Sequence, residues 1–128
     1  MKIVSAAEMG EIDRVTSEKF GVPSTTLMEN AGMAVADFCA AQYPRVERVS
    51  VISGRGNNGG DGFVAAEALR DTVGQISVVI LAKDASELSA DAAAMCSRLQ
   101  VEPIWIGYSS LLGPAPTPLS YFSSPKRA

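Results

Sequence analysis

A run of nine residues at positions 54–62, Gly-Arg-Gly-Asn-Asn-Gly-Gly-Asp-Gly, constrains the fold of this chain more than any other segment. It follows a run of strand composition at 48–53 and precedes an amphipathic helical pattern at 63–73. We therefore expect a tight turn between a strand and a helix. Glycine adopts positive φ and has no Cβ, so such a turn can aim N–H groups at an anionic ligand beside the helix N-terminus. The alternative is a turn whose glycines only permit close packing.

Three polar side chains in this run, Asn57, Asn58 and Asp61, add oxygen atoms to the glycine scaffold. A carboxylate beside a pyrophosphate is repelled unless a cation or a ligand hydroxyl meets it, so Asp61 favours a ligand that brings one of these. Asp61 is also placed to cap the expected helix by accepting from the N–H of Phe63 or Val64. Both roles can coexist, because a carboxylate has two oxygens.

Two helices are expected before the first strand. Ser5 with Glu8 is a capping-box pattern that predicts the start of the first helix. Thr26 with Glu29 repeats the pattern, and the second helix should run to about Tyr43, before a proline. The apolar face of this second helix is expected to carry Leu27, Ala31, Ala34, Val35 and Phe38.

Strands and helices then alternate along the chain. The apolar run at 76–82 indicates a strand covered on both faces, as in a parallel sheet. Apolar residues recur at helical spacing over 88–99, and 101–106 form a short strand interrupted by Pro103. This order implies right-handed crossovers. The expected fold class is α/β: a Rossmann-like parallel sheet with helices on both faces and two N-terminal helices before the first strand.

The composition disfavours several kinds of partner and chemistry. The net charge of −3 offers no broad basic face, so no nucleic-acid partner is expected. No apolar run approaches the roughly 18 residues of a membrane span, so no membrane partner is expected either. The chain has no histidine, the commonest zinc ligand and neutral-pH base. Cys39 and Cys96 are expected to be buried free thiols, and no export signal is visible, which together favour a cytoplasmic protein.

The spacing Gly54-x-Gly56-x-x-Gly59 also matches the dinucleotide-binding turn of Rossmann oxidoreductases. Such a site needs an acidic residue near the end of the next strand to bind ribose, and Asp84 falls close to that place. Two helices before the first strand and the sequence Asn-Asn-Gly-Gly-Asp count against this alternative. A Walker loop is excluded, because no Gly-Lys-Ser/Thr follows.

Two motifs resemble the N-terminal domain of the YjeF type, NAD(P)H-hydrate epimerase: Leu-Met-Glu-Asn-Ala-Gly at 27–32 and the glycine-asparagine run at 54–62. Members of this family interconvert the R and S forms of hydrated, damaged NADH or NADPH. The resemblance implies contacts with hydrated NADH or NADPH at Asn57, Asn58, Gly59, Gly60 and Asp61.

The resemblance also implies a bound potassium ion, K+, with the side-chain oxygen of Asn58 as a ligand, because amide oxygens can replace the water around this cation. It assigns no catalytic residue. The partner that it implies is an ADP- or ATP-dependent dehydratase, as a fused domain or a separate protein, and a homodimer is a further expectation.

The resemblance ends near Ile106. The family pattern continues with an aspartate and a Gly-Thr-Gly turn, then another aspartate and a serine, and none of these follows here. We therefore expect residues 1–106 to form a partial domain with an incomplete second half and impaired epimerase activity. Residues 107–128, rich in proline and serine, are expected to be a disordered tail. The alternative functions are a non-catalytic module that binds a nucleotide or a protein partner, and a fragment of an NAD-dependent oxidoreductase.

Overall fold

A computed structural model describes residues 5–107 of the chain. The predicted tail at 107–128 therefore lies outside the described residues, apart from Gly107. The elements in chain order are α1 (Ala6–Phe20), α2 (Ser24–Gln42), β1 (Arg48–Ser53), α3 (Asn57–Leu69), β2 (Gln75–Ile80), the 3-10 helix η1 (Ala85–Glu87), α4 (Ala90–Cys96) and β3 (Ile104–Trp105).

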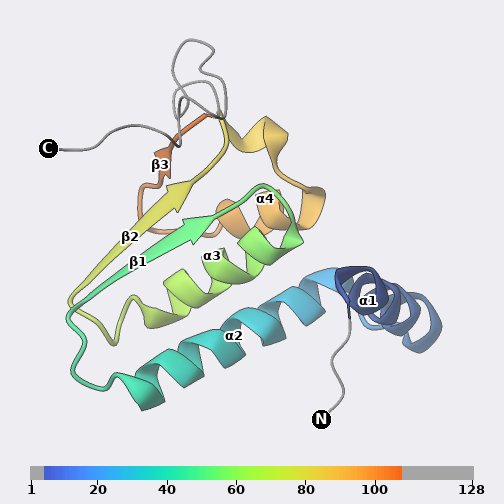
Figure 1. The fold of residues 1–128 in the computed structure, drawn as a ribbon, viewed down its shortest axis with the longest axis horizontal. Coiled ribbons are helices and arrows are strands. Elements are labelled where there is room, and N and C mark those ends of the chain that lie inside the picture. The colour runs from blue at the N-terminus through green and yellow to red at the C-terminus, as the bar shows by residue number, and fades with distance from the viewer. Residues whose placement is uncertain (1–4, 108–128) are drawn as a thin grey trace, which may run out of the picture.

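The three strands form one parallel sheet in the order β1-β2-β3 (Figure 1). The α/β class, the parallel sheet and the two helices before the first strand are confirmed. β1 occupies the predicted range, whereas β2 ends at Ile80, two residues early, and β3 is limited to two residues. β3 begins only after Pro103, because proline has no N–H to donate to a neighbouring strand.

Helices α3 and α4 both pack on one face of this sheet. Val78 and Ile80 of β2 point to that face and share a buried cluster with Phe63 of α3 and Met95 of α4. On the opposite face, Ile52 of β1 is 69% exposed. Helix cover was expected on both faces, and within residues 5–107 it is found on one. The reason is topological. Right-handed crossovers place their helices on the same face of a sheet when each new strand is added at the same edge, as in the order β1-β2-β3. Helices cover the other face only where the strand order reverses.

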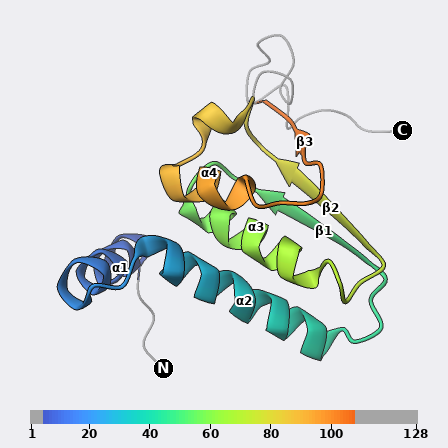
Figure 2. The ribbon, with the colours of Figure 1, turned by 180° about the vertical axis from the view of Figure 1, so that it is seen from behind.

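Helix α2 forms a further layer against α3, on the side away from the sheet (Figures 1 and 2). Its buried residues are Met28, Gly32 and Ala36. A Cβ on Gly32 would lie 2.4 Å from the Cβ of Val64 and 2.7 Å from the carbonyl oxygen of Asp61. Glycine at this position therefore sets the close approach of the two helices.

The apolar face predicted for α2 is wrong for four of its five residues, and the fifth, Leu27, is half-buried. Ala31, Ala34, Val35 and Phe38 are exposed in the structure, and 63% of Phe38 is accessible. The face in contact with α3 is instead the one that carries Gly32 and Ala36, because small residues there permit a short distance between the helix axes. An apolar stripe of α2 is thus left on the surface of residues 5–107.

The start of α2 also differs from the prediction. The helix begins at Ser24 with Pro23 as N-cap and no side-chain cap, so the capping box expected at Thr26 and Glu29 is wrong. The N–H of Thr26 donates to the carbonyl oxygen of Pro23 at 3.0 Å. The helix therefore starts three residues earlier than the polar pattern suggested, directly after a proline whose φ is fixed near the helical value.

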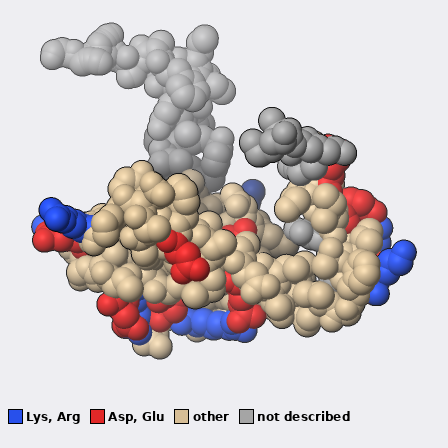
Figure 3. Space-filling model, turned by 90° about the horizontal axis from the view of Figure 1, so that it is seen from below, with Lys and Arg blue, Asp and Glu red and all other residues tan. Residues whose placement is uncertain are grey.

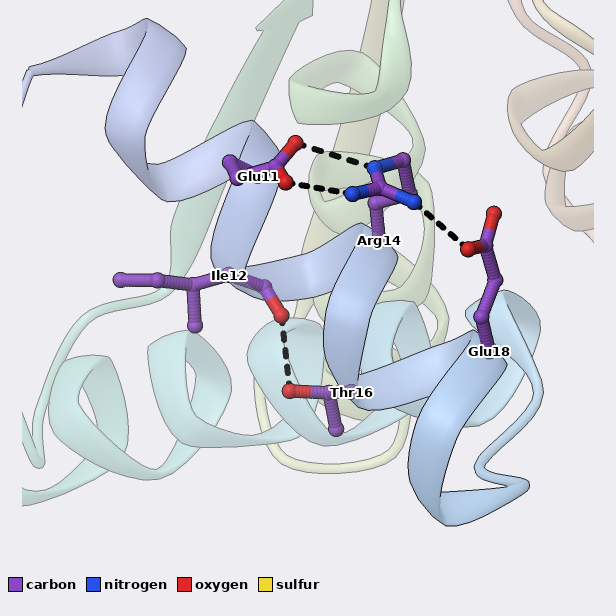
Figure 4. A network of polar contacts seen from close by, with 5 residues as sticks. All are labelled: Glu11, Ile12, Arg14, Thr16 and Glu18. Atoms are coloured by element: carbon purple, nitrogen blue, oxygen red, sulfur yellow. Dashed lines mark hydrogen bonds and ion pairs between the residues drawn. The ribbon is translucent and has the colours of Figure 1, made fainter.

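Helix α1 stands apart from the sheet and contacts α2 (Figures 1 and 2). Its predicted capping box is confirmed: Ser5 Oγ accepts from the N–H of Glu8 at 3.1 Å, and Glu8 accepts from the N–H of Ser5 at 2.9 Å. Arg14 lies between Glu11 and Glu18 and donates to both (Figure 4). These contacts join residues three and four positions apart and stabilise the helix only locally, because water screens exposed charges.

The two cysteines, Cys39 and Cys96, are free, as expected, and both are half-buried. Burial raises the pKa of the Cys96 thiol.

In the view from the α2 side (Figure 3), acidic and basic groups are interspersed and no broad basic surface is visible over the described part of the chain. None of the helices described is both long enough and apolar enough to cross a membrane.

Candidate functional site

The glycine-rich run joins the end of β1 to the start of α3, at the carboxyl edge of the sheet (Figure 1). We expected a loop as far as residue 62 and a helix over 63–73. Instead α3 begins at Asn57, with Gly56 as N-cap, and ends at Leu69. Most of the run is therefore helical. Asp61 lies inside α3, so its predicted role as N-cap is wrong.

The first turn of α3 closes through the backbone. The N–H groups of Gly59 and Gly60 donate to the carbonyl oxygen of Gly56 at 3.0 and 3.3 Å, and no side chain caps the helix. The helix thus starts within a sequence that local propensity assigns to a loop, because glycine is a poor helix former. Tertiary contacts of the same glycines explain why it does.

The glycines of this turn have two different surroundings. A Cβ on Gly59 would lie 2.4 Å from the carbonyl oxygen of Gly54, and one on Gly60 would lie 2.4 Å from the sulfur of a methionine on α2. Nothing lies within 4 Å of a Cβ added to Gly54 or Gly56. The positive φ expected in this turn is not found, since Gly21 is the one glycine with positive φ in the described chain. At positions 59 and 60 glycine permits close packing that a side chain would prevent. At positions 54 and 56 the space beside the backbone is open.

The polar residues predicted for the site lie on the first two turns of α3. Asn57 and Asn58 are exposed, and Asp61 is partly buried. Asn58 and Asp61 are three residues apart and so share a face of the helix. The first N–H groups of a helix have no acceptor within it and carry the positive end of the helix dipole. This end of α3 therefore offers amide hydrogens and carboxamide groups to an anionic ligand.

Two serines that the sequence reasoning missed hold this turn in place. Ser53 is buried at the end of β1, and its hydroxyl donates to the carbonyl oxygen of Gly59 at 3.4 Å. Ser89 donates from Oγ to Asn57 Oδ1 at 2.5 Å and from its N–H to the carbonyl oxygen of Arg55 at 3.0 Å. A signal for Ser89 was present, because a serine near the start of a helical pattern is typical of an N-cap. Ser53 gave no such signal, because a serine that ends a strand run has no distinctive pattern.

Asp84, the acidic residue of the alternative Rossmann interpretation, is used locally. It lies four residues after the end of β2 and caps η1, with Oδ1 accepting from the N–H of Ser86 at 2.9 Å. Hydrogen bonds from the Ser86 hydroxyl and N–H hold the pKa of the Asp84 carboxyl below its usual value. This capping role accounts for an acidic residue at position 84, so its presence does not indicate ribose binding.

A separate hollow of about 240 Å³ lies between α2, α3 and α4. Its walls include Met33, Phe63 and Met95, and an ion pair of 3.1 Å between Arg98 and Glu29 stands at its edge. None of the residues predicted for the nucleotide site lines it. In residues 5–107, no group of three or more His, Cys, Asp or Glu side chains is placed to hold a metal ion.

The strand order, the crossovers and the turn at the carboxyl edge define the class: an α/β protein of Rossmann-like topology. The family model described as YjeF-related protein N-terminus matches residues 24–109, and the chain belongs to this family. The predicted resemblance is thereby confirmed. The crystal structure of the yeast protein YNL200c is similar, with a TM-score of 0.68 and 30% sequence identity, covering 82% of this chain and 47% of that chain.

Curated relatives agree with this membership. The bifunctional NAD(P)H-hydrate repair enzyme Nnr of Moorella thermoacetica is 40% identical over 86 residues, which cover 65% of this chain and 16% of that protein. The NAD(P)H-hydrate epimerase of Limosilactobacillus fermentum is 42% identical over 66 residues, covering 52% of this chain and 32% of that protein. The matched segment thus spans a third or less of the length of both relatives.

Proposed function

We propose that this chain acts in the epimerisation of hydrated NADH or NADPH, and that the start of α3 holds the hydrated nucleotide. The observation that carries the proposal is the pair of exposed asparagines, Asn57 and Asn58, in the first turn of a helix that directly follows a parallel strand. The names of the relatives, NAD(P)H-hydrate epimerase and NAD(P)H-hydrate repair enzyme, give the substrate class.

The geometry of the turn suits a pyrophosphate. Amide hydrogens at the start of α3 and the carboxamides of Asn57 and Asn58 supply donors, and the helix dipole favours negative charge there. The open space beside Gly54 and Gly56 lets a ligand approach the backbone. Gly59 and Gly60 are buried and their N–H groups bond Gly56, so they contribute by keeping the turn tight rather than by presenting a surface to the ligand.

We further propose K+ as the cation of this site, with Asn58 Oδ1 as one ligand. Asn58 is exposed, and Asp61 lies three residues further along on the same face of the helix. Carboxamide oxygen suits a weakly hydrated cation. These residues would hold part of the coordination shell, with ligand oxygens and water completing it. The ion supplies positive charge beside a ligand that already bears two phosphate groups.

The same proposal includes two protein partners. The relative from Moorella is named as bifunctional, which supports an ADP- or ATP-dependent dehydratase as a second domain or a separate protein. The exposed apolar residues Val35 and Phe38 of α2, and Met9, Ile12 and Phe20 of α1, support a homodimer through these helices. The free thiols support a reducing compartment, the cytoplasm.

The test is to give the 128-residue chain hydrated NADH enriched in the R form, and to measure binding by calorimetry and the appearance of the S form by chromatography. We expect saturable binding, tighter for the hydrate than for intact NADH, and exchange faster than in buffer alone. The double variant Asn57→Ala/Asn58→Ala should lose about tenfold or more in affinity. Gln42→Ala, which removes an exposed carboxamide at the far end of α2, is the matched control and should bind like the wild type.

Other outcomes of this experiment would each give a different answer. Binding without exchange would favour the alternative of a non-catalytic nucleotide-binding module. Tighter binding of NADH than of its hydrate would favour an oxidoreductase fragment. Failure to bind the hydrate at all would refute the proposal.

A further inference from the structure

Ser89 connects the start of α4 to the glycine-rich turn, although the two segments are more than thirty residues apart in the chain. Each of its polar groups is hydrogen-bonded. Its N–H donates to the carbonyl oxygen of Arg55 at 3.0 Å, and its carbonyl oxygen accepts from the N–H of Ala93 at 2.8 Å. Its hydroxyl oxygen accepts from the N–H of Ala92 at 3.3 Å and donates to Asn57 Oδ1 at 2.5 Å. The serine is half-buried, whereas Asn57 is exposed.

The direction of these bonds fixes the orientation of the Asn57 carboxamide. A carboxamide oxygen can only accept, so the proton between Ser89 Oγ and Asn57 Oδ1 belongs to the serine, whose oxygen accepts in turn from the N–H of Ala92. The oxygen of the carboxamide is thereby turned toward α4. The two hydrogens on Nδ2 are then directed away from Ser89.

The segment around Ser89 is itself held in place. A guanidinium nitrogen of Arg55, in the glycine-rich turn, lies 4.0 Å from a carboxylate oxygen of Glu87, just before α4. The other carboxylate oxygen of Glu87 accepts from the N–H of Lys83 at 2.6 Å. With the backbone bond from Ser89 to Arg55, these contacts fix the start of α4 against the turn. Ser89 thus approaches Asn57 from an anchored segment rather than from a free loop.

We propose that Ser89 is a positioning residue, which orients Asn57 so that its Nδ2 hydrogens face the bound nucleotide. This inference rests on the proposed function of the turn. It adds that the ligand group at Asn57 is a hydrogen-bond acceptor, such as a phosphate or carboxamide oxygen. Ser89 itself touches no ligand and acts through Asn57. A preoriented carboxamide binds more tightly, because the cost of ordering it has been met before the ligand arrives.

Three substitutions separate positioning from simple helix capping. Ser89→Ala removes both the cap and the donor. Ser89→Asp keeps a good cap acceptor for the N–H of Ala92 but has no proton for Asn57. Ser89→Thr keeps the hydroxyl and should rescue both roles. Ser86→Ala is the matched control, because its hydroxyl bonds Asp84 rather than the turn.

The first measurement needs no nucleotide. In the NMR spectrum of the 128-residue chain, the side-chain amide of Asn57 should have a high order parameter in the wild type, in Ser89→Thr and in Ser86→Ala. It should become mobile in Ser89→Ala. In Ser89→Asp the carboxylate can only accept, so the carboxamide should turn its Nδ2 toward residue 89, while the melting temperature stays at the wild-type value. An Asn57 amide that is equally ordered in Ser89→Ala, or that keeps its wild-type orientation in Ser89→Asp, would overturn the inference.

The second measurement is the affinity for hydrated NADH. Loss of one hydrogen bond predicts about two- to tenfold weaker binding in Ser89→Ala and Ser89→Asp, with recovery in Ser89→Thr. In the Asn57→Ala background, Ser89→Ala should bring no further loss, because the two residues act as a pair. A full loss from Ser89→Ala in that background would overturn the inference. If the wild type binds no hydrate, the proposed function fails instead, and the NMR result alone decides whether Ser89 positions Asn57.

Discussion

Replacement of Gly59 by alanine should destabilise the protein through the turn itself. The added Cβ would lie 2.4 Å from the carbonyl oxygen of Gly54, and real Cβ atoms essentially never approach within 3.0 Å, so the backbone of the turn must move. Overpacking of this kind costs about 1–3 kcal/mol. The better helix propensity of alanine returns up to about 1 kcal/mol. We therefore expect a net loss of up to about 2 kcal/mol, or up to roughly 10 °C in melting temperature for a domain of this size.

The same substitution at Gly54 is the matched control. A Cβ there meets nothing within 4 Å, and φ is not positive, so Gly54→Ala should be neutral or stabilise by up to about 1 kcal/mol, because the unfolded chain loses freedom. Urea unfolding of both variants, followed by circular dichroism, gives the free energies of unfolding. Equal stability of Gly59→Ala and Gly54→Ala would show that the close approach of residues 54 and 59 does not hold the turn.

Three further predictions concern other parts of the molecule. Phe63→Ala should cost about 3–5 kcal/mol in urea unfolding, because Phe63 is fully buried, whereas Phe38→Ala should cost little, because Phe38 is mostly exposed; equal losses would contradict the packing of α2 on α3. Hydrogen bonding from Arg14 lowers the pKa of the Glu11 carboxyl, so this contact stabilises α1 above the ordinary carboxyl pKa and is lost as pH falls through the lowered value; an NMR titration should find the Glu11 midpoint below that of an unpaired glutamate, and Arg14→Gln should raise it again. Burial raises the pKa of the Cys96 thiol, so in a variant that lacks the other cysteine it should react with a disulfide reagent more slowly in the folded chain than in urea, and equal rates would be inconsistent with its burial.

The order of elements could be predicted because it depends on local signals. The capping box at Ser5 and the strand composition of 48–53 were correct to the residue. The buried face of α2 could not be predicted in the same way. Its contact depends on Gly32 meeting Val64 of α3, and nothing within the α2 sequence reveals that a small residue will be preferred to Phe38.

The position of the glycine-rich turn was easier to predict than its internal geometry. The residue types at 54–62 placed it between a strand and a helix. The helix start at Asn57 was missed because local propensity assigns Asn and Gly to a loop, whereas contacts of Gly59 and Gly60 with the rest of the fold make the segment helical. Ser89 was missed because its partner Asn57 is thirty-two positions away in sequence.

The central claim is that the first turn of α3 holds hydrated NADH or NADPH, and NMR mapping tests it most directly. Hydrated NADH is titrated into the labelled 128-residue chain, and backbone and side-chain amide shifts are followed. The account predicts saturable changes concentrated at Asn57 and Asn58 and in the backbone of 54–60. Changes confined to the hollow beside Met33 and Met95, or no saturable change at all, would contradict it.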